Sequence, residues 1–196
     1  LSHSKRLFCN DKNSLVIVLA GEIYNTPELR KDLSTEGEVF RSDMQHEVIA
    51  LLYNKYGIKC LERLRGYFAL CIYDVQKNKL FVARDRMGES TLYYAQIPTG
   101  IVVSTELKNI LSEYISSPQI NITSLLEPIR YIAPLDMEKT WVNQIKRIQH
   151  GHYLEIDVEG IVDNQYWKRS HEPQFVGNKQ EALEHTLDLM QESVDL

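Results

Sequence analysis

The chain has 196 residues, of which 43 % are apolar and 25 % charged, and its formal net charge is −5. These values are typical of a globular protein that buries a core without a metal or disulfide staple. They exclude a basic stripe for nucleic acid and a polybasic membrane patch, and no apolar run approaches the ~18 residues of a membrane span. The three cysteines, Cys9, Cys60 and Cys71, form no CxxC pair, so we expect a reducing compartment, the cytoplasm.

Several segments carry the apolar pattern of β-strands. The first, 15–19, is an uninterrupted aliphatic run, which predicts a strand buried on both faces. Two hairpins follow, with turns at 74–78 and 98–100. The predicted strands are 15–19, 67–73, 79–83, 92–97, 101–104, 144–148, 152–157 and 161–167.

Helices are predicted between these strands from their start and stop signals. Thr26 is the expected N-cap of the first helix, which ends near Gly37. Asp43 is the expected N-cap of the second helix, which stops at Gly57. Pro128 should bend a later one. The remaining predicted helices are 60–64, 106–114, 122–132 and 179–196.

This arrangement of elements predicts an α+β layered domain. Strands in antiparallel hairpins, with helices in separate blocks, argue against a parallel α/β fold. We expect the domain to span residues 1–169. Residues 170–178 are interpreted as a linker, and the amphipathic helix 179–196 as the first element of a following domain.

A set of short motifs occurs in one unbroken order along residues 14–167. They are Gly-Glu-Ile-Tyr-Asn at 21–25, Glu-Val-Ile at 47–49, Cys-Leu-Glu-Arg-Leu-Arg-Gly-Tyr-Phe-Ala at 60–69, Phe-Val-Ala-Arg-Asp-Arg-Met-Gly at 81–88, Leu-Tyr-Tyr at 92–94, Ser-Thr-Glu-Leu-Lys at 104–108, Gly-His-Tyr-Leu at 151–154 and Tyr-Trp at 166–167. The ordered set resembles the glutaminase domain of the asparagine synthetase family, a class II glutamine amidotransferase.

The resemblance implies a four-layer αββα sandwich of the N-terminal-nucleophile hydrolase type, with antiparallel sheets. In that family an N-terminal Cys attacks the glutamine amide, with its own α-amino group as the base. An α-amino pKa of about 8 suits this role. The ammonia passes to a C-terminal synthetase domain that uses ATP and Mg²⁺ to form an aspartyl-adenylate and then asparagine. We therefore expect no cofactor in this chain itself.

The nucleophile of that family has no counterpart here, because residue 1 is Leu. The chain is expected to begin inside a longer product or after a missing segment. Cys9 has no free amine, and we interpret it as a packing or surface thiol. Cys60 and Cys71 are interpreted as small core residues.

The segment Ala20-Gly21-Glu22 corresponds to Asn-Gly-Glu in the family, at the end of the buried strand. There the Asn side chain and the Gly N–H form the oxyanion hole. Ala20 supplies no donor, so the resemblance leaves the backbone N–H of Gly21 as the remaining one. Gly21 and Glu22 stay candidate substrate-binding positions; the alternative for Gly21 is a tight turn after the strand.

A second change falls at the position that binds the substrate's α-ammonium. The family pattern Ser-Asp-Thr-Glu becomes Met-Gln-His-Glu at 44–47, so the binding Asp is replaced by the uncharged Gln45. Asp43 could compensate only with a reshaped turn. The family's Arg for the substrate carboxylate is matched poorly by Arg6-Leu7. Either a loop before Leu15 is deleted, or the chain omits a piece.

Two other groups are interpreted as structural. The charged run Arg84-Asp85-Arg86 with Gly88 is compatible with an anion site, but we favour local pairing beside a hairpin. His150 and His152 lack an acidic or Cys partner at ligand spacing, so we favour a turn over a metal site.

Three functions are compatible with these residues. The first is the N-terminal domain of a glutamine-dependent asparagine synthetase, with glutamine hydrolysis impaired by Ala20 and Gln45. The second is a non-catalytic scaffold of an ATP-dependent amide ligase such as a β-lactam synthetase or lasso-peptide cyclase. The third is an interaction module without a ligase. The expected partners are glutamine, a C-terminal synthetase domain and a second copy in a homodimer; nucleic acid and membrane are not expected.

Overall fold

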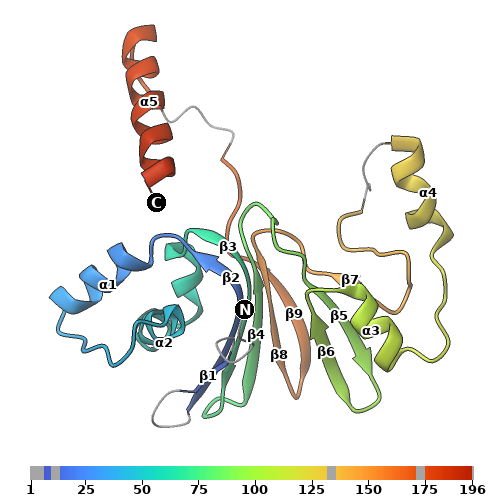
Figure 1. Ribbon diagram of the computed structural model, residues 1–196. Helices are drawn as coiled ribbons and strands as arrows, with labels where there is room; N and C mark the ends of the chain where they lie inside the picture. Colours follow the sequence, from blue (N-terminus) through green and yellow to red (C-terminus); the bar gives the residue numbers. More distant parts are fainter. Residues whose placement is uncertain (1–6, 10–13, 132–135, 171–174, 196) are drawn as a thin grey trace.

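The computed structural model describes residues 7–9, 14–131, 136–170 and 175–195. Two antiparallel sheets form its centre (Figure 1). The six-stranded sheet contains, in spatial order, β1 (Leu7–Cys9), β2 (Leu15–Ile23), β3 (Gly66–Asp74), β4 (Lys79–Arg84), β8 (His152–Asp157) and β9 (Gly160–Gln165). The three-stranded sheet has the order β6 (Gly100–Ser104), β5 (Tyr93–Ile97) and β7 (Lys146–Arg147).

Helices lie outside both sheets. They are α1 (Thr26–Thr35), α2 (Gln45–Tyr56), the 3₁₀ helix η2 (Gly57–Arg63), α3 (Leu107–Tyr114), α4 (Ile122–Tyr131) and α5 (Lys179–Asp195). In Figure 1, α1 and α2 cover the outer face of the six-stranded sheet, and α3 covers the outer face of the three-stranded sheet. The chain therefore forms four layers in the order helix, sheet, sheet, helix.

Three hydrophobic clusters fill the spaces between these layers. The largest joins α1 and α2 to the six-stranded sheet through side chains such as Ile17, Ile49 and Phe68. A second cluster lies between the two sheets, around Val82 and Tyr94. The third joins the three-stranded sheet to α3, and its members include Ala95 and Ile110. The clusters confirm the predicted α+β, four-layer αββα fold with antiparallel sheets.

The burial of β2 alternates along the strand, which corrects one prediction. Leu15, Ile17 and Leu19 are buried against the helices, whereas Val16 and Val18 on the other face are only half-buried. The strand was expected to be buried on both faces. Its helix-facing side is fully covered, but its inner side is not.

Several element boundaries also differ from the predictions. Strand β1 was not predicted, and β2 continues four residues beyond Leu19, to Ile23, because it pairs with β3 along its whole length. Thr26 is the first residue of α1 and not its N-cap, and its hydroxyl donates to the carbonyl oxygen of Ile23 at 2.7 Å. The 60–64 helix is instead a 3₁₀ helix that begins at Gly57.

The expected cap of α2 is wrong as well. The N-cap is Met44, and in the described part of the chain no side chain caps it; Asp43 is exposed. The predicted stop at Gly57 is confirmed, because this glycine ends the helix with a φ of +59°.

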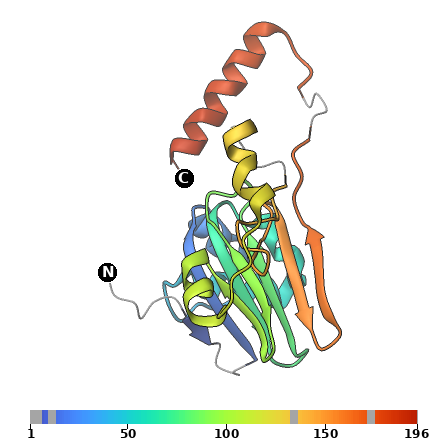
Figure 2. The ribbon, with the colours of Figure 1, turned by 90° about the vertical axis from the view of Figure 1, so that its right-hand side faces the viewer.

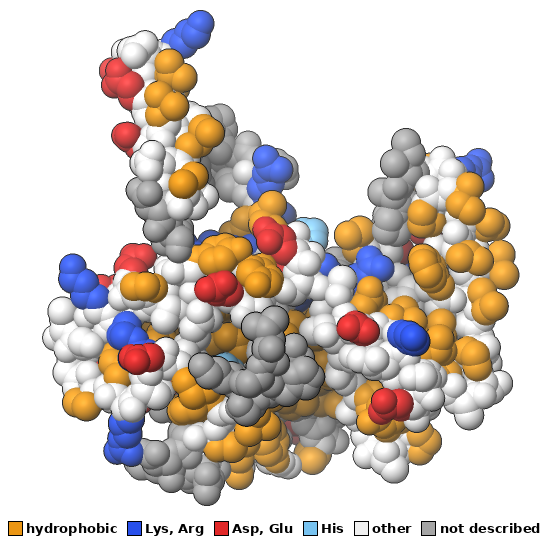
Figure 3. All heavy atoms as spheres, in the orientation of Figure 1, with side chains coloured by type: hydrophobic (Ala, Val, Ile, Leu, Met, Phe, Trp, Pro, Cys, Tyr) orange, Lys and Arg blue, Asp and Glu red, His pale blue; other side chains and the backbone are white. Residues whose placement is uncertain are grey.

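Two helices stand away from the layers. Figures 1 and 2 show α4 and α5 rising from the same end of the molecule, and Figure 3 shows hydrophobic side chains over both. The helix predicted at 179–196 is present as α5. The division into a domain, a linker at 170–178 and the start of a following domain remains a prediction.

Candidate functional site

The end of β2 holds the first predicted site residues, and its geometry explains why Gly21 is a glycine. Gly21 pairs with Phe68 of β3 and has a φ of +119°. A Cβ placed on Gly21 would lie 2.2 Å from the carbonyl oxygen of Tyr67. The requirement comes from the close approach of the facing strand, and not from a tight turn after the strand.

A second glycine, Gly66 on the facing strand β3, makes a similarly close approach to the backbone of β2. Gly66 pairs with Ile23 and has a φ of +148°. A Cβ on Gly66 would lie 2.1 Å from the carbonyl oxygen of Glu22. The two glycines therefore let the backbones of β2 and β3 approach each other on both sides of Glu22, whose side chain is exposed.

Gln45 is the first residue of α2 and is joined directly to this strand end. Its side-chain Oε1 accepts a hydrogen bond from the backbone N–H of Ile23 at 3.0 Å. The structure thus brings Gln45 beside the backbone of Ile23 at the end of β2. The carboxamide oxygen of Gln45 therefore has a structural role, since it satisfies a backbone N–H at the end of β2.

Asn25 completes the connection between β2 and the loop before β3, and sequence reasoning did not single it out. Its buried side chain donates from Nδ2 to the carbonyl oxygen of Arg63 at 3.0 Å and accepts from the backbone N–H of Arg65 at 2.9 Å. An Asn just before Thr-Pro, two residues after the end of a strand, is a turn signal that could have predicted such a bond.

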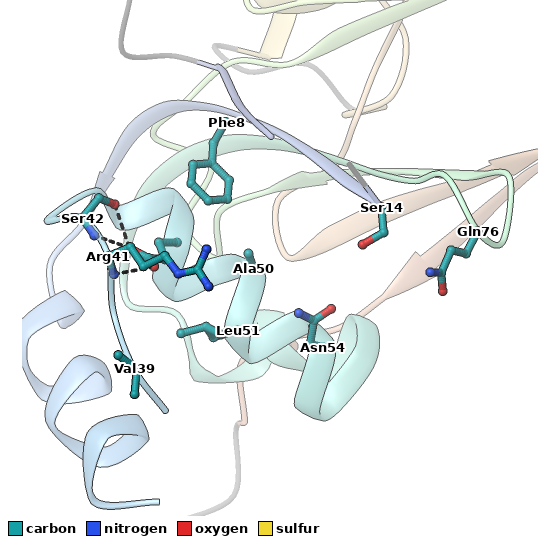
Figure 4. Close-up of a pocket in the computed structure, with 10 residues that line it drawn as sticks. Phe8, Ser14, Val39, Arg41, Ser42, Ala50, Leu51, Asn54 and Gln76 are labelled. Carbon is teal, nitrogen blue, oxygen red and sulfur yellow. Dashed lines mark hydrogen bonds between the residues drawn. The ribbon is translucent and has the colours of Figure 1, made fainter. Parts of the chain in front are cut away.

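A hollow of about 580 Å³ lies on the helix side of the six-stranded sheet, against α2 (Figure 4). Its lining includes Phe8, Arg41, Glu47 and Asn54, but none of the predicted site positions. The buried Glu47 carboxylate accepts from the backbone N–H of Arg41 and from Ser42. Burial opposes ionisation, but these bonds hold the pKa of Glu47 below its usual value. Glu47 thus anchors the loop before α2.

The Arg84-Asp85 segment connects the two sheets by bonds to backbone groups. The Arg84 guanidinium donates to three carbonyl oxygens, those of Ser90, Gly88 and Ile148, at 2.5, 2.6 and 2.9 Å. Burial lowers the pKa of Arg84. With its three nitrogens directed at carbonyls, the side chain presents no fork for an anion. The predicted structural role is supported, although the partners are backbone atoms and not neighbouring charges.

Asp85 organises the other side of the same loop. Its Oδ1 accepts from the backbone N–H groups of Met87, Gly88 and Glu89, and its Oδ2 accepts from that of Ser90 at 2.9 Å. The residue is 1 % exposed. A buried carboxylate with four backbone donors fixes the loop that carries the chain from β4 to β5.

The cysteines differ in their surroundings. Cys9 is exposed on β1, Cys60 is fully buried and Cys71 is half-buried. Burial raises the pKa of both the Cys60 and the Cys71 thiols to about 12, so both stay protonated near neutral pH. This is consistent with their interpretation as core residues.

His152 has a local partner, since its Nδ1 lies 2.8 Å from the Oδ1 of Asp163 on the paired strand β9. Within the described ranges, no group of three or more His, Cys, Asp or Glu side chains is placed to hold a metal ion. Among the same residues, no helix combines the length and apolarity that crossing a membrane requires.

The family of the chain follows from a sequence profile. The profile described as "Glutamine amidotransferase domain" matches residues 2–167, which includes both sheets and the Gly21–Gln45 site. The chain belongs to this glutamine amidotransferase domain family. The resemblance to class II amidotransferases is thereby confirmed.

Curated relatives of this amidotransferase domain are longer proteins. "Asparagine synthetase [glutamine-hydrolyzing] 2" of Bacillus subtilis (strain 168) is 33 % identical over 81 % of the chain and 21 % of that protein. "Asparagine synthetase [glutamine-hydrolyzing] 3" of the same organism is 31 % identical over 79 % of the chain and 25 % of that protein. "Amidase chyE" of Penicillium rubens is 31 % identical over 75 % of the chain and 21 % of its length. The domain thus spans a fifth to a quarter of these relatives.

Solved structures share the fold of the amidotransferase domain. "Glutamine phosphoribosylpyrophosphate (PRPP) amidotransferase from B. subtilis complexed with ADP and GMP" superposes with a TM-score of 0.58 at 20 % identity, over 85 % of this chain and 32 % of that one. "Structure of the allosteric regulatory enzyme of purine biosynthesis" gives the same score and identity, over 85 % and 31 %. Both likenesses concern the αββα fold alone.

Proposed function

We propose that this chain is the glutaminase-type domain of an asparagine-synthetase-like, ATP-dependent amidotransferase. Glutamine is the proposed amide donor, and the ammonia converts an aspartyl-adenylate to asparagine in a synthetase domain that uses ATP and Mg²⁺. The family match over 2–167 and the two Bacillus relatives support this function. The free cysteines, one of them exposed, favour the cytoplasm as its location.

We further propose that glutamine hydrolysis by this domain is impaired. The observation that carries this proposal is the hydrogen bond between Gln45 Oε1 and the Ile23 N–H. A neutral oxygen that already pairs a backbone donor makes a weak ligand for an ammonium group, whereas a hydrogen bond to a charged group contributes about 1.5–3 kcal/mol.

Ala20 supports the same proposal independently. Its methyl group has no hydrogen-bond donor for a developing oxyanion, and loss of one such donor lowers kcat by about 10²–10³-fold. Ala20 lies inside β2, opposite Ala69, within a strand that otherwise keeps its register. The substitution thus changes the site chemistry without disturbing the strand.

These two residues also favour a second candidate, a non-catalytic scaffold for an ATP-dependent amide ligase. Such a ligase takes ammonia or an internal amine and has no need of glutamine. The close approach of β2 and β3 at Gly21 and Gly66 and the Asn25 bonds would then serve only to hold the fold.

The test uses the complete polypeptide that contains this chain and compares two nitrogen donors. Purified protein is supplied with ATP, Mg²⁺ and aspartate, and asparagine is measured with either glutamine or ammonium chloride. We expect asparagine from ammonia and at least a hundredfold less from glutamine. Equal rates with both donors contradict impaired hydrolysis. If no asparagine forms with glutamine and none forms with ammonium chloride, the synthetase assignment is contradicted and the scaffold is favoured.

A further inference from the structure

The hollow beside α2 is a second candidate binding site, away from the Gly21–Gln45 site. Its volume of about 580 Å³ lies within the range of about 300–1,000 Å³ that small-molecule pockets occupy. Ser14 and Gln76 line it, next to the end of the six-stranded sheet at which Leu15 pairs with Asp74. The Gly21–Gln45 site adjoins the opposite end of the same strands. We call this pocket the α2 hollow.

Arg41 supplies a positive charge at one side of the α2 hollow. Figure 4 shows its side chain reaching from the loop before α2 toward Ala50, between Phe8 and Leu51. A guanidinium presents five N–H donors in a planar fork, which matches the geometry of a carboxylate and leaves donors for a ligand beside a protein partner. This side of the hollow therefore combines a carboxylate-binding group with apolar walls.

The loop that carries Arg41 is held in place by Glu47. The Glu47 Oε1 accepts from the Arg41 backbone N–H at 2.8 Å, and its Oε2 accepts from the Ser42 N–H and hydroxyl at 2.8 and 2.7 Å. Glu47 is 8 % exposed. These three donors offset the charge of the carboxylate, and they fix the loop before any ligand arrives. A preformed wall lowers the entropic cost of binding.

The other side of the α2 hollow is polar but uncharged. It is lined by Ser14, Asn54 and Gln76, which Figure 4 places beyond Ala50 as seen from Arg41. Asn54 and Gln76 are exposed carboxamides, and each offers two N–H donors and an acceptor oxygen. A ligand amide, with one N–H and one carbonyl oxygen, is complementary to such groups.

An adjoining hollow of about 210 Å³ extends this polar side, because Ser14, Asn54 and Gln76 line it as well. Its charged groups are paired, since the Lys77 Nζ lies 2.9 Å from the Oδ2 of Asp74. The same Oδ2 accepts a hydrogen bond from the Tyr53 hydroxyl at 3.0 Å. The extension therefore favours an uncharged end of a ligand and leaves room for a substituent on its amide group.

We propose that the α2 hollow binds a small carboxylate that carries an apolar side chain and an amide group, the chemistry of an N-acylated amino acid. The carboxylate pairs with Arg41, the apolar side chain packs on Phe8 and Leu51, and the amide bonds to Asn54 and Gln76. The site is independent of the proposed function, because none of these residues belongs to the Gly21–Gln45 site.

The first test compares three probes with the complete polypeptide that contains this chain, by ligand-observed NMR titration. N-acetyl-leucine has all three groups, N-acetyl-leucinamide lacks the carboxylate and N-acetylglycine lacks the apolar side chain. We expect saturable binding of N-acetyl-leucine. N-acetyl-leucinamide should bind at least tenfold more weakly, since it forms no charge-assisted bond to the guanidinium. N-acetylglycine should lose a similar factor, because it buries no apolar side chain.

The second test locates the binding site with variants. Arg41→Met removes the guanidinium but keeps the backbone N–H that binds Glu47, so the loop anchor stays. It should lower the affinity for N-acetyl-leucine at least tenfold and abolish the preference over N-acetyl-leucinamide. Asn54→Ala should weaken both leucine probes by the same factor. Arg130→Met is the matched control and should change nothing, because Arg130 is exposed on α4, across the molecule from α2 (Figure 1).

Two further measurements keep the outcome decisive. Urea unfolding shows whether each variant is folded. Arg41→Lys keeps the charge without the fork and should lose only part of the affinity for N-acetyl-leucine. Absence of saturable binding of N-acetyl-leucine at millimolar concentration overturns the proposal. Equal affinities for the three probes overturn it too, as does an unchanged affinity in folded Arg41→Met protein.

Discussion

The side-chain oxygen of Gln45 and the backbone N–H of Ile23 are joined by a hydrogen bond of 3.0 Å, which ties the start of α2 to the end of β2. We expect Gln45→Ala to lower the free energy of unfolding by about 1–3 kcal/mol, because the half-buried N–H of Ile23 loses its partner. Urea unfolding followed by circular dichroism measures the change. Gln76→Ala, at an exposed position in the β3–β4 turn, is the control and should stay within about 0.5 kcal/mol of the parent. An equal effect of both substitutions would contradict the structural role of Gln45.

A comparison of Gly66, at the β2–β3 contact, with Gly100 separates the energetic cost of backbone strain from that of close packing. Gly66 has a φ of +148° and a Cβ on it would lie 2.1 Å from the carbonyl oxygen of Glu22, whereas Gly100 has a φ of +143° and nothing within 4 Å of its Cβ position. Gly100→Ala should therefore cost only the strain of its backbone, about 1–3 kcal/mol. Gly66→Ala should cost about 1–3 kcal/mol more, because the strands must separate. Urea unfolding of both variants measures the difference, and equal losses would show that the contact is unimportant.

The sequence was sufficient for the order of the helices and of the strands after β1, because the apolar period, Thr26-Pro27 and Gly57 are local signals. The layers followed from the family resemblance. Strand β1 was missed because Leu7–Cys9 is three residues long and is defined by pairing with β2, a non-local contact. The partial exposure of Val16 and Val18 depends on how far the second sheet extends, and no local pattern encodes that.

At the candidate site, too, the sequence did not reveal non-local contacts. The positions Ala20, Gly21 and Gln45 came from matching motifs to a family, which identifies a residue but not its contacts. The bond from Ile23 to Gln45 joins residues 22 positions apart, and that from Arg65 to Asn25 spans 40. The four amides around Asp85 are local, yet Asp85 was expected to pair with a neighbouring charge. Side-chain bonds to the backbone depend on loop geometry that the sequence alone does not give.

Asp85 should be among the least replaceable carboxylates of the chain. Asp85→Asn puts an NH₂ group in place of one oxygen, facing backbone N–H groups, and removes the charge that strengthens the remaining bonds. We expect a loss of about 2–3 kcal/mol in the free energy of unfolding. Asp43→Asn, at an exposed position that caps no helix, is the matched control and should change it by less than about 0.5 kcal/mol. Urea unfolding at neutral pH compares the two variants, and a neutral Asp85→Asn would rule out the anchoring role.

The cysteines should differ strongly in reactivity. Cys60 and Cys71 have a pKa of about 12, so at pH 8 their thiolate fraction is on the order of 10⁻⁴. Iodoacetamide added to native protein at pH 8 should therefore modify the exposed Cys9 alone, as measured by intact mass. Cys9→Ser should abolish the modification in the native state, and urea should restore two modified sites. Rapid labelling of Cys60 in folded protein would show that the core around η2 opens readily.

Glu47 should make stability depend on pH on the acid side. Its pKa in the folded protein lies below the ordinary value of 4.5, since burial is outweighed by the bonds from Ser42 and Arg41. The unfolded chain therefore binds a proton first as pH falls, and the stabilising contribution, fully present above the unfolded pKa, is lost between that value and the folded pKa. Glu47→Gln should be less stable than the parent at pH 7, and the difference should shrink as pH falls below about 4.5. Urea unfolding from pH 7 to pH 3 measures both curves. A constant difference over this range would mean that the Glu47 side chain acts through its shape and not through its charge.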